Sequence, residues 1–450
     1  MTRSRSTDNL FRHLLFQRLK TIRDGQLVIV ESGATREFGQ SGDDQPEPIT
    51  LTVHHPRFYR RAVLGGGLGV AESLGEGDWS SSDLTGLVRL FVRNLAGADV
   101  VNGPLGGLRH QVARVGHQLA RNTVGRARRN IWQHYDLSND FFRLFLDETL
   151  TYSCGLFRSP QDDLQQASVE KIDRACRLLD LQPGDHLLEI GTGWGGLALH
   201  AARHYGCRVT TTTISARQHE LAAERIAESG VADRIRLLFE DYRSLQGQYD
   251  KLVSIEMIEA VGHQYYDTFF RKCGQLLKPD GEMLLQAITI VDYRFAHHRR
   301  TVDFIKQYIF PGGCLPSTTA LLTAMSRTSR MRLVHLADFA EHYATTLRTW
   351  RQRFRERLPE IRQLGFDDRF LRIWEYYFAY CEAAFLERHV NVSQMLFAQP
   401  GSRVDPLSRL GEPAGQAEHA PVSPLASGPR RRVDQDAPAE PMPAGRGDRA

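Results

Sequence analysis

Between about Asn130 and Gln399, short apolar runs alternate with longer segments of helical periodicity. The apolar runs are Leu187–Ile190, Val209–Ile214, Ile235–Leu238, Lys251–Ile255 and Met283–Ile290. The helical segments are Gln165–Leu179, Gly196–His204, Ala216–Ser229 and Tyr265–Leu277. This alternation is typical of βαβ units, which build a mainly parallel sheet with helices on both faces. We therefore predict a doubly wound α/β fold for this region.

Composition divides the chain into four regions. Residues 1–100 read as a smaller accessory domain, and residues 101–129, rich in arginine and glycine, as a linker and an entry helix. The α/β domain then spans residues 130–399. Residues 400–450 consist largely of Pro, Ala, Gly and Arg, so we expect a disordered tail.

The first region mixes an amphipathic start at Leu10–Leu19 with the strand-like runs Leu27–Glu31 and Ile49–His54. The glycine cluster Gly65–Gly69 and the polar segment Glu72–Trp79 predict turns. We therefore expect a small mixed α and β domain.

Charge and apolar content limit the partners. The net charge of +4 is slight for 450 residues and argues against a nucleic-acid binder. No apolar run approaches the roughly 18 residues of a membrane span, and the N-terminus lacks a secretory pattern. We expect a cytoplasmic protein, peripheral at the inner membrane surface, whose arginine clusters meet lipid headgroups. A solvated helix face is the alternative for each cluster.

A glycine loop follows the first apolar run of the α/β region. Gly191, Gly193 and Gly195 permit a tight turn and a close approach to a ligand. A nicotinamide oxidoreductase would carry an acidic residue at the end of the next strand, and Val209–Ile214 has none. That alternative is disfavoured.

A methyltransferase explains the acidic residues better. Glu189 lies on the first strand, close to the expected amino-acid end of S-adenosylmethionine, and Asp241 and Tyr242 follow the third strand, where an adenine is held. In the alternative, these carboxylates only cap helices.

Several ordered motifs resemble the cyclopropane-fatty-acyl-phospholipid synthase family, which includes the mycolic acid cyclopropane synthases. They are His134–Phe142, Leu146–Cys154, Leu188–Gly196, Thr213–Gln218, Tyr308–Gly313 and Thr346–Trp350. Upstream, Gly67–Ser73 and Gly77–Trp79 are similar to the N-terminal domain of the longer members. The resemblance implies a Rossmann-like class I methyltransferase domain with helical insertions.

The resemblance also implies a site. Its cofactor residues would be Tyr152, Ser153, Leu187, Leu188, Glu189, Ile190, Gly191, Thr192, Gly193, Trp194, Gly195, Thr213, Ile214, Ser215, Gln218, Asp241 and Tyr242. In the family, a bicarbonate ion near the methyl group is held by residues that match Cys154, Glu259, Ile288 and Tyr343. A late cysteine, here Cys381, counts as an active-site residue.

Three departures from the family concern the site. Thr192 replaces a usual Cys, and the segment Glu256–Ala260 replaces Gly-Met-Phe-Glu-His. Gln286 replaces the histidine that helps hold bicarbonate, and glutamine donates a hydrogen bond without carrying charge. The bicarbonate site is thus in question, and the product need not be a cyclopropane.

The predicted reaction adds a carbon from S-adenosylmethionine to the cis double bond of an unsaturated phospholipid acyl chain. The resulting carbocation needs a dry, aromatic-lined cavity and a base. We predict Glu259 as the residue that directs or holds that base, with a buried structural carboxylate as the alternative. His263, His297 and His298 form no recognisable metal set, so we expect no metal.

Other functions stay open at this point. One is a small-molecule amine N-methyltransferase of the same family, and another is a lipid- or cofactor-binding protein without activity. The oligomeric state is also open, with a homodimer as one option because dimers occur among the longer family members.

Overall fold

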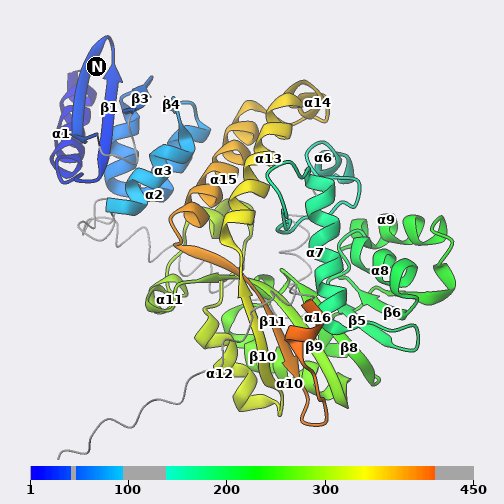
Figure 1. The fold of residues 1–450 in the computed structure, drawn as a ribbon. Helices are drawn as coiled ribbons and strands as arrows, with labels where there is room; N and C mark the ends of the chain where they lie inside the picture. The colour runs from blue at the N-terminus through cyan, green and yellow to red at the C-terminus, as the bar shows by residue number, and fades with distance from the viewer. Residues whose placement is uncertain (1, 42–46, 95–137, 411–450) are drawn as a thin grey trace, which may run out of the picture. The chain divides into compact units, whose positions relative to one another are not determined.

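The computed structural model describes residues 2–41, 47–94 and 138–410. Two sheets organise these residues, one of four strands and one of seven (Figure 1). The predicted linker and entry helix over 101–129, and the tail from 411 onward, lie outside the described residues. No helix in the described ranges is long and apolar enough to span a membrane.

The seven-stranded sheet confirms the predicted α/β fold. Neighbouring strands from β7 through β9 are parallel, whereas β11 runs antiparallel to both β9 and β10. In spatial order the strands are β10 (Arg332–Asp338), β11 (Val390–Ala398), β9 (Leu277–Ile290), β8 (Tyr249–Ile255), β5 (His186–Ile190), β6 (Arg208–Thr212) and β7 (Ile235–Leu238).

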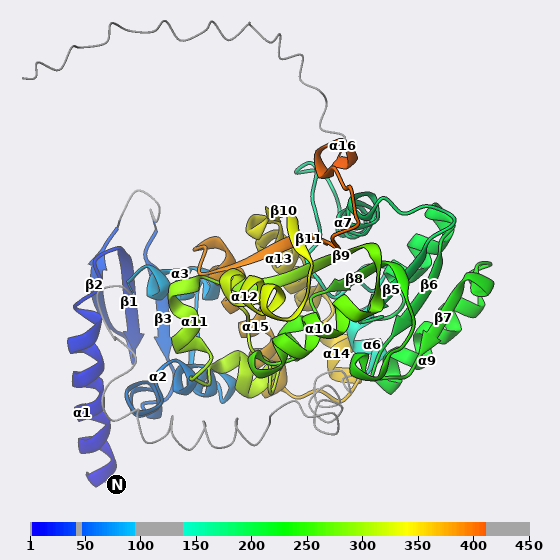
Figure 2. The ribbon, with the colours of Figure 1, turned by 90° about the horizontal axis from the view of Figure 1, so that it is seen from below.

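Alternation along the strands divides the core of this sheet between its two faces. Leu187 packs with residues of α7 and α8, whereas its neighbour Leu188 packs with residues of α10 and α12. Figure 2 shows α10 and α12 on one side of the strands and α7 on the other. The bounds of these helices are α7 Leu164–Leu179, α8 Gly196–His200 continued by the π-helical turn η2 Ala201–Tyr205, α9 Ala216–Ala227, α10 Tyr266–Leu276 and α12 Thr318–Thr328.

A second group of helices carries an aromatic core beside the sheet. Phe141, Phe145, Trp350 and Phe378 are fully buried and stack in chains of edge-on contacts with Trp374. Helices α13 and α15 run side by side (Figure 1). The members are α6 Asn139–Arg143, α11 Asp292–His298, the π-helical turn η7 Ile305–Ile309, α13 Ala340–Glu356, α14 Leu358–Gln363 and α15 Asp368–Leu386; single 3-10 turns are η3 Ala232–Arg234, η4 Tyr242–Ser244, η5 Ile258–Ala260 and η6 His263–Tyr265.

The N-terminal region holds the four-stranded sheet, in the order β2-β1-β3-β4. Apolar side chains of alternate residues in β1 and β3 point into its core. The elements are α1 Thr2–Leu19, β1 Gly25–Glu31, β2 Ala34–Gln40, β3 Ile49–Val53, α2 Arg57–Gly75, β4 Trp79–Ser81 and α3 Leu84–Asn94.

The turn predicted at Gly65–Gly69 is wrong, because α2 passes through this cluster. The helix is interrupted only at Gly66, whose φ of 56° and ψ of −144° lie outside the helical region. A Cβ on Gly69 would stand 2.0 Å from the carbonyl oxygen of Arg61. These glycines therefore permit an interruption and a close backbone approach within a helix.

Polar contacts join the N-terminal region to α15. Thr85 Oγ1 donates to Oε2 of the buried Glu382 at 2.9 Å, and Arg89 Nε donates to Oε1 of Glu387 at 2.6 Å. The proposed boundaries between domains remain predictions.

Part of the stretch that composition assigns to the tail contacts the α/β domain. Ser402 is buried and its Oγ donates to Oε1 of Glu282 at 2.8 Å. Helix α16 (Pro406–Leu410) brings Arg409 Nη1 to 2.6 Å from Oε2 of the same carboxylate. Residues 401–410 are thus anchored on β9.

Candidate active site

The glycine loop leaves β5 and enters α8. Gly191 and Gly193 have φ of 105° and 54°, a region that side-chain-bearing residues rarely adopt. The backbone N–H groups of Gly191 and Thr192 donate to the carbonyl oxygen of Thr212 at 3.1 and 3.0 Å. The loop is therefore tied to the end of β6 while its other edge borders a cavity.

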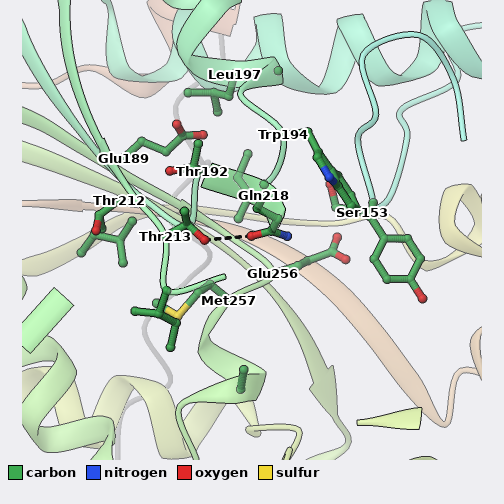
Figure 3. A pocket seen from close by; sticks show the side chains of 18 of the residues that line it. Ser153, Glu189, Thr192, Trp194, Leu197, Thr212, Thr213, Gln218, Glu256 and Met257 are labelled. Carbon is green, nitrogen blue, oxygen red and sulfur yellow. Dashed lines mark hydrogen bonds between the residues drawn. The ribbon is translucent and has the colours of Figure 1, made fainter. Parts of the chain in front are cut away.

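Thirteen of the predicted cofactor residues line this cavity (Figure 3). They are Tyr152, Ser153, Glu189, Ile190, Gly191, Thr192, Gly193, Trp194, Thr213, Ile214, Gln218, Asp241 and Tyr242. Within it, Thr213 Oγ1 donates to Oε1 of Gln218 at 2.9 Å. The loop and the ends of β6 and β7 therefore meet at one cavity.

Four predicted residues do not line the cavity. Leu187 and Leu188 are fully buried in the sheet core, because consecutive side chains of a strand point to opposite faces. Gly195 stands at the start of α8, and the Oγ of Ser215 caps α9 by accepting from the backbone N–H of Gln218. These residues support the cavity through the backbone and the helix start.

Glu189 is a buried carboxylate at this cavity. Its Oε2 accepts a 2.6 Å hydrogen bond from Thr211 Oγ1. Burial raises its pKa to about 8, although the Thr211 hydrogen bond and Lys171 oppose the rise. A cationic group that binds beside Glu189 would stabilise its ionised form.

Lys171 is a cavity residue that sequence reasoning missed, because a lysine inside a helix usually faces solvent. Its side chain is buried, and Nζ donates to Oγ of Ser153 at 2.8 Å. Burial lowers the pKa of Lys171, and the charges of Glu256 and Glu189 oppose that shift. Lys171 thus interacts electrostatically with two buried carboxyl groups, Glu256 and Glu189.

The adenine end of the predicted site is built by Asp241, Tyr242 and Arg243. Both carboxylate oxygens of Asp241 accept from Arg243, Oδ1 from Nε at 2.8 Å and Oδ2 from Nη2 at 2.7 Å. The hydroxyl of Tyr242 is buried and has no hydrogen-bond partner among the described residues. That unpartnered hydroxyl is available to a polar ligand.

A second, more apolar cavity adjoins the first. Tyr152, Glu256 and Ala260 line both cavities and therefore mark where they meet. Its other aromatic lining residues are Phe310, Tyr343, Tyr377, Tyr380 and Phe385. Phe141 and Phe142 do not line this cavity and pack with Phe145 and Trp374.

Glu256 stands at this junction, and sequence reasoning did not select it as a site residue. Its Oε1 accepts from the backbone N–H of Cys154 at 3.0 Å and from Gln286 Nε2 at 2.7 Å. Its Oε2 accepts from the hydroxyl of Tyr343 at 2.6 Å. Three of the predicted bicarbonate-site residues therefore surround a carboxylate of the chain itself.

The backbone of Glu256 is strained. Its φ is 48°, in the left-handed region, at the position where the resembled family usually has glycine. Such a conformation costs a non-glycine residue about 1 to 2 kcal/mol. The three hydrogen bonds to its carboxylate hold Glu256 there.

Glu259 and Ile288 form a neighbouring pair. Glu259 Oε1 accepts from the backbone N–H of Ile288 at 2.5 Å, whereas its Oε2 is buried without a partner among the described residues. Burial first and then the charge of Glu256 raise the pKa of Glu259 to about 8. Glu259 therefore holds a proton at neutral pH.

The remaining predicted residues are also located. Gln286 is oriented by Gln394, whose Nε2 donates to Oε1 of Gln286 at 2.9 Å, so the amide group of Gln286 points its donor at Glu256. Burial raises the pKa of the Cys154 thiol well above its usual range. Cys381 lines the second cavity from α15, and burial raises its thiol pKa too. Both thiols are therefore neutral.

Sheet order and loop define the class of the protein. Six strands share one direction, and one antiparallel strand, β11, is inserted between β9 and β10. This order, together with a glycine loop after β5, defines a class I S-adenosylmethionine-dependent methyltransferase. The residues present fit that cofactor, since the buried Glu189 suits its ammonium group and the unpartnered Tyr242 hydroxyl suits a polar group at the other end.

Comparison with known proteins identifies the family. The family model for mycolic acid cyclopropane synthetase matches residues 122–395, which is more than half of the chain. This chain belongs to that family of S-adenosylmethionine-dependent methyltransferases.

Named relatives and a solved structure agree with this assignment. Tuberculostearic acid methyltransferase UfaA1 of Mycobacterium tuberculosis is 39% identical over 86% of this chain and 90% of its own. The cyclopropane-fatty-acyl-phospholipid synthase of Escherichia coli K12 is 34% identical over 78% and 88%. The structure of mycolic acid cyclopropane synthase CmaA1 with SAH and CTAB is 33% identical, covers 60% of this chain and 98% of its own, and gives a TM-score of 0.57.

Proposed function

We propose that this protein methylates the double bond of an unsaturated fatty acyl chain of a phospholipid, with Glu256 as the resident base. The observation that carries the proposal is the carboxylate of Glu256 at the meeting point of the cofactor cavity and an aromatic-lined apolar cavity. A long acyl chain matches the second cavity because most of its lining is apolar.

The first cavity would hold S-adenosylmethionine, which supplies an electrophilic methyl group when bound. Glu189 would hold its ammonium group, and Lys171 opposes the rise in the pKa of that carboxyl caused by burial. Thr213 and Gln218 would meet the ribose, and Asp241 and Tyr242 the adenine. These residues orient the donor, and positioning supplies much of the rate enhancement for a weak nucleophile such as an alkene.

The second cavity would protect the cation that methyl addition leaves on the acyl chain. Tyr152 contacts both cavities, and Phe310 and Tyr377 stand beside it in the second. Their ring faces stabilise positive charge, and the apolar walls exclude the water that would quench the cation.

Glu256 would accept the proton that the methylated chain loses. Burial raises the pKa of Glu256, and the hydrogen bonds from Tyr343, the Cys154 backbone and Gln286 oppose that rise by stabilising the ionised form. Glu259 next to it keeps its own proton, so one negative charge faces the cation. On this proposal the chain uses its own carboxylate where the family uses bicarbonate.

We propose a methylated chain without a ring as the product. Loss of a proton from a chain carbon leaves a methylated alkene, whereas loss from the new methyl group closes a cyclopropane. Neither outcome needs a reductant. Support for the first comes from Glu256 and Gln286, which depart from the resembled pattern. A relative at 39% identity that is named a tuberculostearic acid methyltransferase adds to this support.

Mass spectrometry of total phospholipid acyl chains tests the proposal, using cells that express this protein and are fed methyl-labelled methionine. Acyl chains heavier by one labelled carbon are expected, with fragmentation that shows an alkene and no ring. Cells that express Glu256→Gln serve as the control. Label on a small soluble amine and on no acyl chain would overturn the proposal in favour of amine N-methylation, and absence of label from both would favour a non-catalytic protein.

A further inference from the structure

The segment 292–300, formed by α11 and the two residues after it, carries a concentration of positive charge. Arg299 and Arg300 are exposed and Arg294 is half-buried. None of the three forms an ion pair with an acidic side chain in the part of the chain that the structure describes. The one acid of the segment, Asp292, accepts from the backbone N–H of Thr319 and so caps α12. The positive charge is therefore not neutralised locally.

The same segment has an apolar and aromatic side. Tyr293 is 82% exposed, the largest exposure among the exposed large hydrophobic residues of the described chain. Phe295 packs into the core, and the guanidinium of Arg299 lies 5.9 Å from the centre of its ring. Exposed tyrosine together with arginine is typical of side chains at the boundary between lipid headgroups and acyl chains.

This segment adjoins the apolar cavity. His298, at the end of α11, and Asp303, five residues later, line that cavity. His389 lines it as well, and burial together with the charge of Arg294 lowers its pKa to about 4. Asp303 is 31% exposed, whereas Tyr343 at the Glu256 end is buried. The cavity wall therefore includes both the buried Glu256 and a partly exposed residue, Asp303, close to α11.

We propose that segment 292–300 is the surface on which this protein docks to a bilayer of anionic phospholipid, placing the acyl chain at the α11 end of the cavity. The inference rests on the proposed function for the identity of the chain that enters. Each arginine near an anionic membrane contributes about 1 kcal/mol of attraction. Tyr293 would insert at headgroup depth.

A bilayer fits this surface better than an acidic protein does. A stable protein interface needs about 800 Å² from each partner, contributed by roughly 20 residues. Segment 292–300 offers nine residues. A membrane requires no such area, since a few basic and aromatic side chains give reversible attachment.

Vesicle sedimentation with the full-length protein tests this surface. Wild type and the double variant Arg299→Glu/Arg300→Glu are compared on vesicles of phosphatidylglycerol and of phosphatidylcholine. Loss of the two arginines should weaken binding to phosphatidylglycerol by about thirtyfold or more. Binding of wild type should also fall with added salt and on phosphatidylcholine. Tyr293→Ser should weaken binding with less change in its salt dependence.

Arg271→Glu/Arg330→Glu provides the matched control. Both arginines are exposed, and neither forms an ion pair in the described chain or lines the cavity. The change in charge equals that of Arg299→Glu/Arg300→Glu. This control should bind vesicles like wild type. Unchanged S-adenosylmethionine affinity by calorimetry shows that each variant is folded.

Equal vesicle binding by wild type and Arg299→Glu/Arg300→Glu would overturn the proposal. The proposal would also be overturned if the protein bound an acidic acyl carrier protein through these arginines and bound no vesicle. Because sedimentation needs no turnover, a docking result stands apart from the labelling result. If the protein docks through α11 but methylates no acyl chain, the docking proposal stands and the proposed reaction is refuted.

Discussion

The hydroxyl of Tyr343 donates a 2.6 Å hydrogen bond to Oε2 of Glu256, and the two residues lie 87 positions apart in the chain. Gln286 and the Cys154 backbone satisfy the other carboxylate oxygen. Because the Glu256 carboxylate already occupies these three hydrogen-bond donors, a bicarbonate ion is not needed to accept from them. We regard Glu256 as the group that replaces the bicarbonate implied by the family resemblance.

Replacement of Glu259 by Gln should change how stability depends on pH. In the folded protein Glu259 holds its proton up to about pH 8, whereas in the unfolded chain a glutamate releases it near pH 4.3. The contribution of Glu259 is therefore full below that lower value and is lost as pH rises toward 8. The Glu259→Gln variant has no carboxyl group at this position, so its stability should not fall for this reason as pH rises.

Chemical unfolding of the two proteins without cofactor at pH 5 and pH 8 measures the effect. Wild type should lose stability relative to Glu259→Gln by about 1.4 kcal/mol per pH unit at most across this range. Glu228 is exposed, so the control variant Glu228→Gln should show the same dependence of stability on pH as wild type. Parallel pH profiles for wild type and Glu259→Gln would show that the Glu259 carboxyl is ionised in the folded state.

Lys171→Met should weaken S-adenosylmethionine binding about tenfold near neutral pH. Burial raises the pKa of Glu189 to about 8 and Lys171 opposes that rise, so without Lys171 ionising this carboxyl beside the bound ammonium costs more free energy. Calorimetry gives the affinity. Lys278→Met, which breaks a half-exposed pair with Asp250, is the control and should bind normally. Equal affinities for all three proteins would remove Lys171 from the site.

Gly193→Leu should abolish cofactor binding while the protein still folds. A Cβ at Gly193 meets no atom within 4 Å, so the added side chain enters the open cavity, and the φ of 54° adds about 1 to 2 kcal/mol of strain. Gly230→Leu is the matched control, because it also has positive φ and open surroundings but lies outside the cavity. Calorimetry and thermal melting separate the two effects; normal affinity of Gly193→Leu would contradict the cradle assignment.

Strand pattern was enough to predict the sheet, and the family resemblance selected thirteen residues that line one cavity. Glu256 escaped prediction although its segment was recognised as a departure. Its partners Cys154 and Tyr343 lie 102 and 87 residues away, and only the tertiary fold brings them together. Lys171 escaped because a lysine in an amphipathic helix gives no sign of burial.

The turn predicted at the glycine cluster of α2 was wrong because local sequence suggested a structure that tertiary packing does not adopt. Repeated glycines predict a turn from local propensity, but the close approach of Gly69 to Arg61 is a packing requirement within a helix. Composition also placed residues 401–410 with the tail, since the pairing of Arg409 with Glu282 depends on a residue 127 positions away.

Two truncations should differ in stability. Deleting residues 401–450 removes Ser402 and Arg409 from Glu282, a carboxylate that is 3% exposed and then keeps only Lys251. Breaking such a buried pairing costs a few kcal/mol, about 3 at the lower end. Deleting residues 411–450 leaves these contacts. Thermal melting should therefore place the first truncation well below the second, and identical melting would show that residues 401–410 do not stabilise the fold.

Bicarbonate dependence of turnover tests the role of Glu256 most directly. Purified wild type and Glu256→Gly are assayed on vesicles of unsaturated phospholipid in buffer stripped of bicarbonate, and again after bicarbonate is added. Wild type should turn over equally in both, whereas Glu256→Gly should be about a hundredfold slower or worse without the ion and recover in part with it. A wild-type enzyme that needs bicarbonate, or a Glu256→Gly variant that is fully active without it, would contradict the assignment of Glu256 as the resident base.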